Sequence, residues 1–586
     1  MASGGPAGRE DQPPRTAEEV QPARAGTLDQ PIKLGPLGLD WPIHPLLFAL
    51  SPVASLLASN LEYMAVGEAA RAAVFVSLLA VALTLAAWFP FRDWKKAALI
   101  ATPVLAVALS YGHLYSALKL VFGALIVRHR YLGPLLIIAL AGWVLTVKRR
   151  VRAPSPLTAA LNVAGAAALL FPLMALVTAP EGRFDAQEEV EEELTDPLDD
   201  FAGGPEGRDV YYIILDGYGR QDVLLDIYGH DNSEFLQALE QRGFQIAEYS
   251  TANYNQTVLS LASSLNMDYL DSLLGRRDLK LTNAMLVRLI WRSQVRRELA
   301  RWQYDMVAFK TGFSYTAIED AELFLFPEGQ GDEVERTSAA SRANAFEGLL
   351  FESSAARVLL DSSEAAREAV HHFLNEPLFA EQRERVLFTL ETLGSIPELP
   401  GRHFVFAHVV APHPPFVFDE QGEPLTPDYP FSFADGSHYL RYGTDTREDY
   451  IAGYRGQLRY LNGLLIETLD QILESSKQLP IIILQGDHGP GAYLRWENIM
   501  ESNLEERSAI LNAFLLPGAP DAVYPTISPV NAFRLVLSRY FGADLPPLHD
   551  CVLFSSTSDR DQFQQVGGCL APGRTWSRGA VEPAGP

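Results

Sequence analysis

The chain has 586 residues, of which 72 are acidic and 47 are basic, and its formal net charge at pH 7 is −25. That charge argues against a nucleic-acid-binding protein, whose phosphate contacts need clustered Lys and Arg side chains. Two cysteines exclude a disulfide-rich scaffold and a Cys₄ zinc site. Residues 1–180 contain 15 Lys/Arg and 9 Asp/Glu, a net charge of +6, so the rest of the chain has −31. A slightly basic first third therefore precedes a strongly acidic remainder.

Residues 1–35 show no apolar periodicity and are rich in Pro, Gly, Ala and Glu, so they are predicted to be a disordered tail. Residues 36–180 contain five apolar stretches, at residues 44–60, 72–91, 97–115, 131–147 and 158–177. A helix that crosses a bilayer needs about 20 apolar residues, within a range of about 17–25. Each stretch fits, although the first is short and contains Ser and Asn. Five such runs, almost free of charge, favour a transmembrane domain of five helices over a buried helical bundle.

The Lys and Arg residues between these stretches predict the orientation of the helices. Eleven of them lie in the tail and in the loops that follow the second and fourth stretches, and four lie in the other loops. Loops rich in Lys and Arg stay on the cytoplasmic side, so the chain after residue 177 is expected on the periplasmic or extracellular side. The sequence therefore predicts a multi-pass protein of the cell membrane with a large external domain.

Residues 181–207 are predicted to be an acidic linker. Residues 181–200 contain ten acids and one base, and like charges at this density repel one another, which favours a solvated tether. A calcium-binding loop is the alternative, but the segment has no alternating ligands around a turning glycine.

From residue 208 to residue 545, short β-rich runs alternate with helical stretches, which is typical of an α/β domain with crossover connections. The clearest strands are VYYIILDG, DMVAFK, HFVFAHVV and PIIILQGDHG, and a mostly parallel sheet is predicted from them. Residues 546–586 form a C-terminal extension, and Cys551 and Cys569 in it are expected to form a disulfide, because both lie in the external part of the chain.

In open α/β sheets, ligands bind at the carboxyl ends of the strands, and three such ends have polar side chains. Asp216 follows the first strand, His413 follows HFVFAHVV, and Asp487 and His488 lie between two glycines after PIIILQ. Each feature alone is typical of a turn or of a hydrogen-bonded polar residue. Together, carboxylates and imidazoles are suitable ligands for a divalent cation.

A hydroxyl nucleophile is predicted at Thr257, where a polar, turn-rich run leads into the helical sequence VLSLASSL. The N-terminal N–H groups of a helix favour anions, and Asn253 is a candidate further donor to the substrate. Two alternatives are that Thr257 is an ordinary N-cap and that Asn255-Gln256-Thr257 is a glycosylation sequon.

The sequences LDGYGR, NQT before SLASSL, APHPPF and GDHG resemble motifs of the alkaline phosphatase/sulfatase superfamily. With the preceding membrane spans, the layout resembles the lipoteichoic acid synthase and lipid A phosphoethanolamine transferase branch. The resemblance implies an alkaline-phosphatase-like α/β/α catalytic domain over residues 208–545. It also implies one divalent metal ion, manganese or zinc with magnesium or calcium as alternatives, bound by Asp216, Thr257, Asp487 and His488. His413 matches a histidine that contacts the transferred group.

The sequence departs from this pattern at two places. The Cys/Ser-x-Pro-x-Arg motif of sulfatases is absent around Thr257, which favours phosphoryl transfer over sulfate-ester hydrolysis. The lipid-transferase branch usually has Glu at the position of Asp216, and Asp is more similar to the phosphodiesterase and phosphatase branches. His403 and His408, with Asp209, are an alternative set of ligands for a second metal. One metal is favoured, because His403 lies at the start of its strand, far from the strand's carboxyl end.

The function expected from these features is transfer of a phospho-headgroup, of phosphoglycerol or phosphoethanolamine type, from a membrane lipid or lipid-linked substrate through a covalent threonine intermediate. A membrane-tethered phosphatase, phosphodiesterase or sulfatase is the alternative within the same superfamily. A transporter is disfavoured because the spans have almost no internal charge. An inactive binding protein is disfavoured because none of the four expected ligands is missing.

Overall fold

The computed structural model describes residues 41–60, 66–122, 127–178, 207–275, 281–330, 344–427, 429, 431–442, 446–496, 498–556, 560 and 562–572. The predicted N-terminal tail and, except for Gly207, the predicted acidic linker lie outside these residues. The predicted domain boundaries at residues 35, 180, 207 and 545 stay predictions.

Within the residues that the structure describes, four N-terminal helices are long and apolar enough to cross a membrane: Val66–Phe91, Trp94–Lys119, His129–Arg150 and Ser155–Val177. The helices themselves are α1 (His44–Ala58), η1 (Val66–Ala69), α2 (Ala70–Phe91), α3 (Trp94–Phe122), α4 (His129–Arg150) and α5 (Ser155–Thr178). At 1.5 Å per residue, α1 is about 22 Å long, shorter than a hydrocarbon core of about 30 Å. The predicted count of five spanning helices is therefore not confirmed, although α1 packs along α5, α3 and α2. Large apolar side chains such as Phe75 and Phe171 are 63% and 83% exposed, as contact with lipid requires.

The external domain contains a seven-stranded sheet with the strand order β2-β7-β6-β1-β5-β3-β4. Its strands are β1 (Val210–Leu215), β2 (Gln245–Ile246), β3 (Asp305–Phe309), β4 (Leu323–Leu325), β5 (His403–Val409), β6 (Ile481–Gly486) and β7 (Asn512–Leu515). The pairs within β6-β1-β5-β3-β4 are parallel, and the two pairs that involve β7 are antiparallel. The prediction of a mostly parallel sheet is confirmed.

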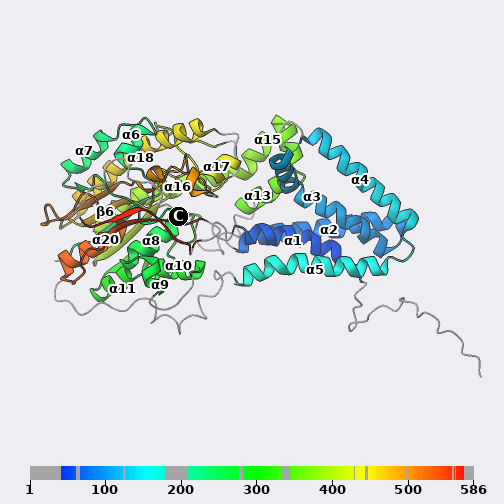
Figure 1. Cartoon of the computed structure of the whole chain (residues 1–586), viewed down its shortest axis with the longest axis horizontal. Helices are drawn as coiled ribbons and strands as arrows, with labels where there is room; N and C mark the ends of the chain where they lie inside the picture. The colour runs from blue at the N-terminus through cyan, green and yellow to red at the C-terminus, as the bar shows by residue number, and fades with distance from the viewer. Residues whose placement is uncertain are drawn as a thin grey trace, which may run out of the picture.

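The central strand β1 is apolar along its whole length because both of its faces are covered. Tyr211, Ile213 and Leu215 belong to one buried cluster, and the alternate residues of the strand belong to another. Figure 1 shows the two helical layers. One layer consists of α6 (Gln221–Asp226), α7 (Ser233–Gln241), α16 (Glu376–Leu393) and α18 (Arg447–Ser475). The other consists of α8 (Thr257–Asn266), α9 (Leu270–Gly275), α10 (Asn283–Trp291), α11 (Gln294–Arg301) and α20 (Pro529–Val536).

A helical insertion between β4 and β5 packs against the membrane helices. It contains α13 (Ala345–Ser353), α14 (Arg357–Ser362), α15 (Glu364–Val370) and η5 (His371–Asn375), and Figure 1 shows α13 and α15 between the sheet and the N-terminal helices. Phe346 of α13 is fully buried among residues of α1, α2 and α3. Arg71 and Glu347 form an ion pair of 2.9 Å, and Ala355 N donates to Ala108 O at 2.6 Å. The insertion therefore fixes the external domain to the membrane helices.

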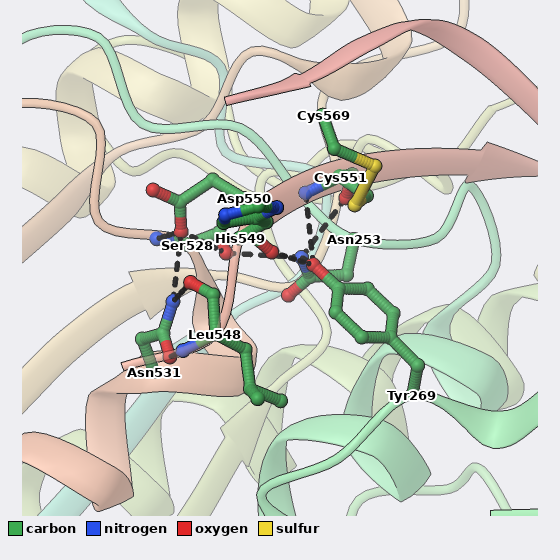
Figure 2. Close-up of a disulfide and its surroundings, with 9 residues drawn as sticks. All are labelled: Asn253, Tyr269, Ser528, Asn531, Leu548, His549, Asp550, Cys551 and Cys569. Atoms are coloured by element: carbon green, nitrogen blue, oxygen red, sulfur yellow. Dashed lines mark hydrogen bonds between the residues drawn. A yellow bond between two sulfur atoms is a disulfide. The ribbon is translucent and has the colours of Figure 1, made fainter. Parts of the chain in front are cut away.

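The C-terminal extension folds back onto the external domain as an antiparallel hairpin of β8 (Asp550–Phe554) and β9 (Gln564–Leu570). Cys551 and Cys569 form the predicted disulfide across it, as Figure 2 shows. Shorter helical segments are η6 (Ile396–Glu398), α17 (Ser437–Tyr442), η7 (Ile499–Glu501), α19 (Leu504–Ser508) and η8 (Leu537–Phe541).

Candidate active site

Three neighbouring parallel strands bring the predicted carboxylates and imidazoles to one edge of the sheet. Asp216 follows β1, and Asp487 and His488 follow β6, which pairs directly with β1. All three side chains are buried. Adjacent parallel strands end side by side, so residues that are 270 positions apart in sequence meet here: Gly217 N donates to Asp487 Oδ1 at 3.0 Å.

Asp216, Asp487 and His408 form a buried group that fits a metal ion. One ligand atom from each lies within 4.8 Å of the other two. Asp216 Oδ1, Asp487 Oδ2 and His408 Nε2 are buried without a hydrogen-bond partner. Buried polar atoms without partners are costly, and a divalent cation would satisfy all three. The donor set, two carboxylates and an imidazole, suits manganese and zinc.

Thr257 is the first residue of α8, and its side chain points into this group. Its Oγ1 lies 3.1 Å from His488 Nε2, which is itself 3.5 Å from Asp216 Oδ1 and 3.4 Å from Asp487 Oδ2. The structure thus brings together the four residues predicted as metal ligands.

Both alternatives for Thr257 fail. The N-cap of α8 is Gln256, so Thr257 is not the cap. Asn255, the acceptor of the sequon, is buried and its amide is bonded to Ser555 O at 3.0 Å, so it is not open to glycosylation.

His413 lies beside the buried group of Asp216, Asp487 and His408, in the loop that follows β5. Its backbone N donates to Asp216 O at 3.0 Å, and its ring lies 6.1 Å from that of His488, centroid to centroid. Its Nε2 is 3.7 Å from Asp435 Oδ2. This position suits the predicted contact of His413 with a transferred group, which stays a prediction.

Arg507 and Asp435 complete the site and were not predicted. Arg507 Nη1 lies 2.6 Å from Asp435 Oδ2, and its Nη2 lies 3.1 Å from His488 Nε2. The same guanidinium donates through Nε to Asn255 O at 2.9 Å, in the segment before Thr257. Arg507 comes from the short helix α19 and Asp435 from irregular chain before α17, so no sequence pattern marked either residue.

His408 belongs to the main site and not to a separate one. Its Nε2 lies 3.3 Å from Asp216 Oδ2, and its Nδ1 is hydrogen-bonded to Thr316 Oγ1 at 2.9 Å. His403 instead pairs with Asp209, 3.2 Å away, at the opposite end of β5. Five residues of extended strand span about 16 Å, so His403 and His408 cannot share one ion. The alternative second-metal set of Asp209, His403 and His408 is therefore wrong.

The surroundings of the site favour ionised carboxylates and a neutral His488, which are the protonation states that metal binding needs. Burial raises the pKa of Asp216, but His413, His408 and His488 outweigh it and hold the pKa below its ordinary value. Burial likewise opposes ionisation of Asp435, and Arg507 and His413 lower its pKa overall. Burial and then Arg507 lower the pKa of His488, which favours a neutral imidazole with a lone pair for a cation.

Asn253 was predicted to be a further donor to the substrate, but its side chain is hydrogen-bonded to neighbouring protein groups (Figure 2). Its Nδ2 lies 3.0 Å from each of Tyr269 Oη, Ser528 Oγ and Cys551 O. Its Oδ1 accepts from Val530 N at 2.8 Å. These bonds give Asn253 a structural role, and its contact with a substrate stays a prediction.

No protein-family model and no curated protein matches the chain. Among solved structures, the C-terminal periplasmic domain of EcEptC from Escherichia coli is 11% identical, with a TM-score of 0.36, and the match covers 61% of this chain and 93% of that one. The integral membrane lipooligosaccharide phosphoethanolamine transferase A of Neisseria meningitidis is 11% identical, with a TM-score of 0.34, and the match covers 84% and 94%. A phosphonate monoester hydrolase of Agrobacterium radiobacter is 16% identical, with a TM-score of 0.34, over 60% and 82%.

These similar structures are enzymes of the kinds that the sequence motifs resemble. Sulfatases, including a 2-O GAG sulfatase, match at a TM-score of 0.33.

Proposed function

We propose that this protein is a membrane-bound, metal-dependent enzyme of the alkaline phosphatase/sulfatase superfamily that transfers a phosphoglycerol- or phosphoethanolamine-type headgroup through a covalent intermediate on Thr257. The observation that supports this most directly is the position of the Thr257 hydroxyl. It lies at the start of a helix, 3.1 Å from His488 Nε2, beside buried carboxylates with unpaired oxygens.

Asp216, Asp487, His488 and Thr257 would hold one divalent ion, manganese or zinc, and His408 lies within reach of the same position. Such an ion lowers the pKa of a coordinated hydroxyl and neutralises charge on phosphoryl oxygens. The three buried atoms without partners support this assignment.

The chain's own residues supply the nucleophile and the charge stabilisation. Thr257 Oγ1 would form a bond to phosphorus while the bond from phosphorus to the donor's alcohol oxygen breaks, and the alcohol departs with the proton lost by Thr257. The N–H groups at the start of α8 would stabilise the negative oxygens of the phosphoryl group, with Arg507 beside them. His413 would carry the proton to the leaving oxygen. An acceptor hydroxyl then attacks the phosphothreonine and restores Thr257.

A lipid donor is supported by the way in which the external domain is attached to the membrane helices. Helix α13 packs on α1, α2 and α3, near the ends of these helices that lie away from the Lys/Arg-rich segments 92–96 and 148–152. That arrangement agrees with a catalytic domain on the periplasmic or extracellular side. Water in place of the acceptor hydroxyl would make the same site a phosphodiesterase, and with a phosphate or sulfate monoester as donor it would be a phosphatase or sulfatase.

Headgroup transfer is tested with the full-length protein in lipid nanodiscs that contain phosphatidylglycerol or phosphatidylethanolamine. We expect diacylglycerol release that needs Mn²⁺ or Zn²⁺ and is lost in Thr257→Ala and in chelator. Release of the free headgroup phosphate in parallel would identify a hydrolase, and turnover of a sulfate ester but no lipid would overturn the proposal.

A further inference from the structure

The segment that leads into Thr257 is held by the C-terminal hairpin. Asn255 Nδ2 donates to Ser555 O at 3.0 Å, and Ser555 N donates back to Asn255 Oδ1 at 3.0 Å. This reciprocal pair joins residues 300 positions apart in the chain. Ser555 directly follows β8, so the hairpin's position determines that of Asn255.

The residue next to the nucleophile is held by the same part of the chain. Gln256 Nε2 lies 3.0 Å from Ser555 O and 3.1 Å from Ser555 Oγ. Its Oε1 accepts from Arg560 Nε at 2.9 Å. Because Gln256 is the N-cap of α8, these bonds fix the point at which the helix begins, one residue before Thr257.

Two further bonds connect the start of the segment to the hairpin close to its disulfide. Leu553 N donates to Asn253 O at 2.8 Å, and Asn253 Nδ2 donates to Cys551 O at 3.0 Å. Cys551 is bonded to Cys569 of β9, as Figure 2 shows. The disulfide thus closes the hairpin two residues before Leu553.

The segment depends on the hairpin for several hydrogen bonds of its buried amide side chains. Asn253, Asn255 and Gln256 are at most 6% exposed. Buried amides that lose their partners are costly, so segment and hairpin are expected to be ordered together. This segment leads directly into Thr257, whose Oγ1 lies 3.1 Å from His488 Nε2.

We infer that the disulfide-closed hairpin of β8 and β9 is a positioning element of the active site, which holds residues 253–256 and thereby aims the Thr257 hydroxyl. The effect that this positioning has on catalysis rests on the proposed function. Asn255, Gln256 and Arg560 act through Thr257, so they are positioning residues.

The kinetic test uses the full-length protein and the lipid donor assay. In Asn255→Ala and in the double variant Cys551→Ser, Cys569→Ser, we expect kcat to fall by about tenfold to a hundredfold and KM to change by less than about twofold, since misplacement of a reacting group affects the transition state. Asn255→Asp keeps the acceptor for Ser555 N and is expected to recover part of kcat. Gln564→Ala, at an exposed position on β9 of the same hairpin, is the matched control and should match wild type.

A second measurement does not depend on activity. Hydrogen exchange of the amides of residues 253–259 is compared between wild type and the double variant, and also with reduced, alkylated wild type in case the double variant fails to fold. We expect exchange in this segment to accelerate by about tenfold or more while β1 and β6 stay protected. Unchanged exchange with the disulfide open would overturn the inference.

The two measurements separate failure of this inference from failure of the proposed function. Faster exchange with unchanged kcat, while Thr257→Ala is inactive, would overturn positioning and leave the proposed function intact. If Thr257→Ala is as active as wild type, the proposed function fails, and the positioning of a nucleophile falls with it whatever the exchange shows.

Discussion

At the scale of single residues, the site depends on buried charges that compensate one another. Arg507 and Asp435 are 2% and 5% exposed and pair at 2.6 Å. Asp435 also accepts from Tyr450 Oη at 2.7 Å. Removal of one partner of a buried ion pair leaves an uncompensated charge, which is far more costly than removal of both.

Arg507→Ala is therefore expected to lower the free energy of unfolding by about 3–5 kcal/mol, because the Asp435 carboxylate stays buried without its guanidinium. The double variant Arg507→Ala, Asp435→Asn should recover a large part of that loss. Denaturant-induced unfolding of the detergent-solubilised protein measures both. Equal stability of the single and double variants would contradict a charge-pair role for Arg507.

At the scale of elements, the backbone of α13 lies unusually close to that of α3, at Gly112. A Cβ on Gly112 of α3 would collide with the carbonyl oxygen of Glu352 and lie 2.8 Å from Ser353 Cα. Backbone atoms cannot move aside as the end of a flexible side chain can. The glycine thus lets the insertion lie directly against the membrane helix.

Gly112→Ala is expected to weaken this contact by about 1–3 kcal/mol, as overpacking does. Hydrogen exchange in α13 should rise by about tenfold or more. Gly142→Ala in α4 is the matched control, because nothing lies within 4 Å of its Cβ position. An equal effect of the two substitutions would show that the close approach is not what holds α13.

The same contact is expected to make stability depend on pH through Glu352. Burial raises its pKa from 4.5 to about 7. The stability that the neutral carboxyl provides is present below pH 4.5 and is lost as the pH rises through about 7. Glu352→Gln should thus be more stable than wild type at pH 8, by a difference on the order of 3 kcal/mol, and similar to wild type at pH 4.5. Thermal unfolding at both pH values checks this, and a difference that is larger at pH 4.5 would contradict it.

At the scale of the whole molecule, a metal ion would connect the residues that follow strands β1 and β6 to the start of helix α8. A ligand that binds only the folded state at 100 times its Kd adds about 2.7 kcal/mol to the free energy of unfolding. We expect Mn²⁺ or Zn²⁺ to raise the unfolding temperature of the full chain and chelator to reverse this. Asp487→Asn should abolish the increase, and an undiminished increase in that variant would place the metal elsewhere.

The sequence predicted those parts of the molecule that have a local pattern. Asp216, Asp487 and His488 follow apolar strands, and Thr257 begins an apolar helix, so strand ends and a helix start were sufficient to find them. His408 lies within the strand β5 and was assigned only to a second metal, because its place inside an apolar run does not indicate that it lies beside Asp216. Arg507 and Asp435 reach the site from irregular chain and a short helix, through contacts that no spacing encodes. The first apolar stretch was counted as a span, but its helix α1 ends after 15 residues.

The covalent intermediate on Thr257 is tested most directly by mass spectrometry of the full-length protein, quenched in acid during turnover of a lipid donor. Our account predicts that the peptide containing Thr257 gains the mass of the transferred phospho-headgroup in the presence of Mn²⁺ or Zn²⁺, with the modification mapped to the Thr257 side chain. The adduct should disappear when an acceptor is added and be absent in Thr257→Ala. Steady turnover with an unmodified Thr257, or turnover that survives Thr257→Ala, would contradict it.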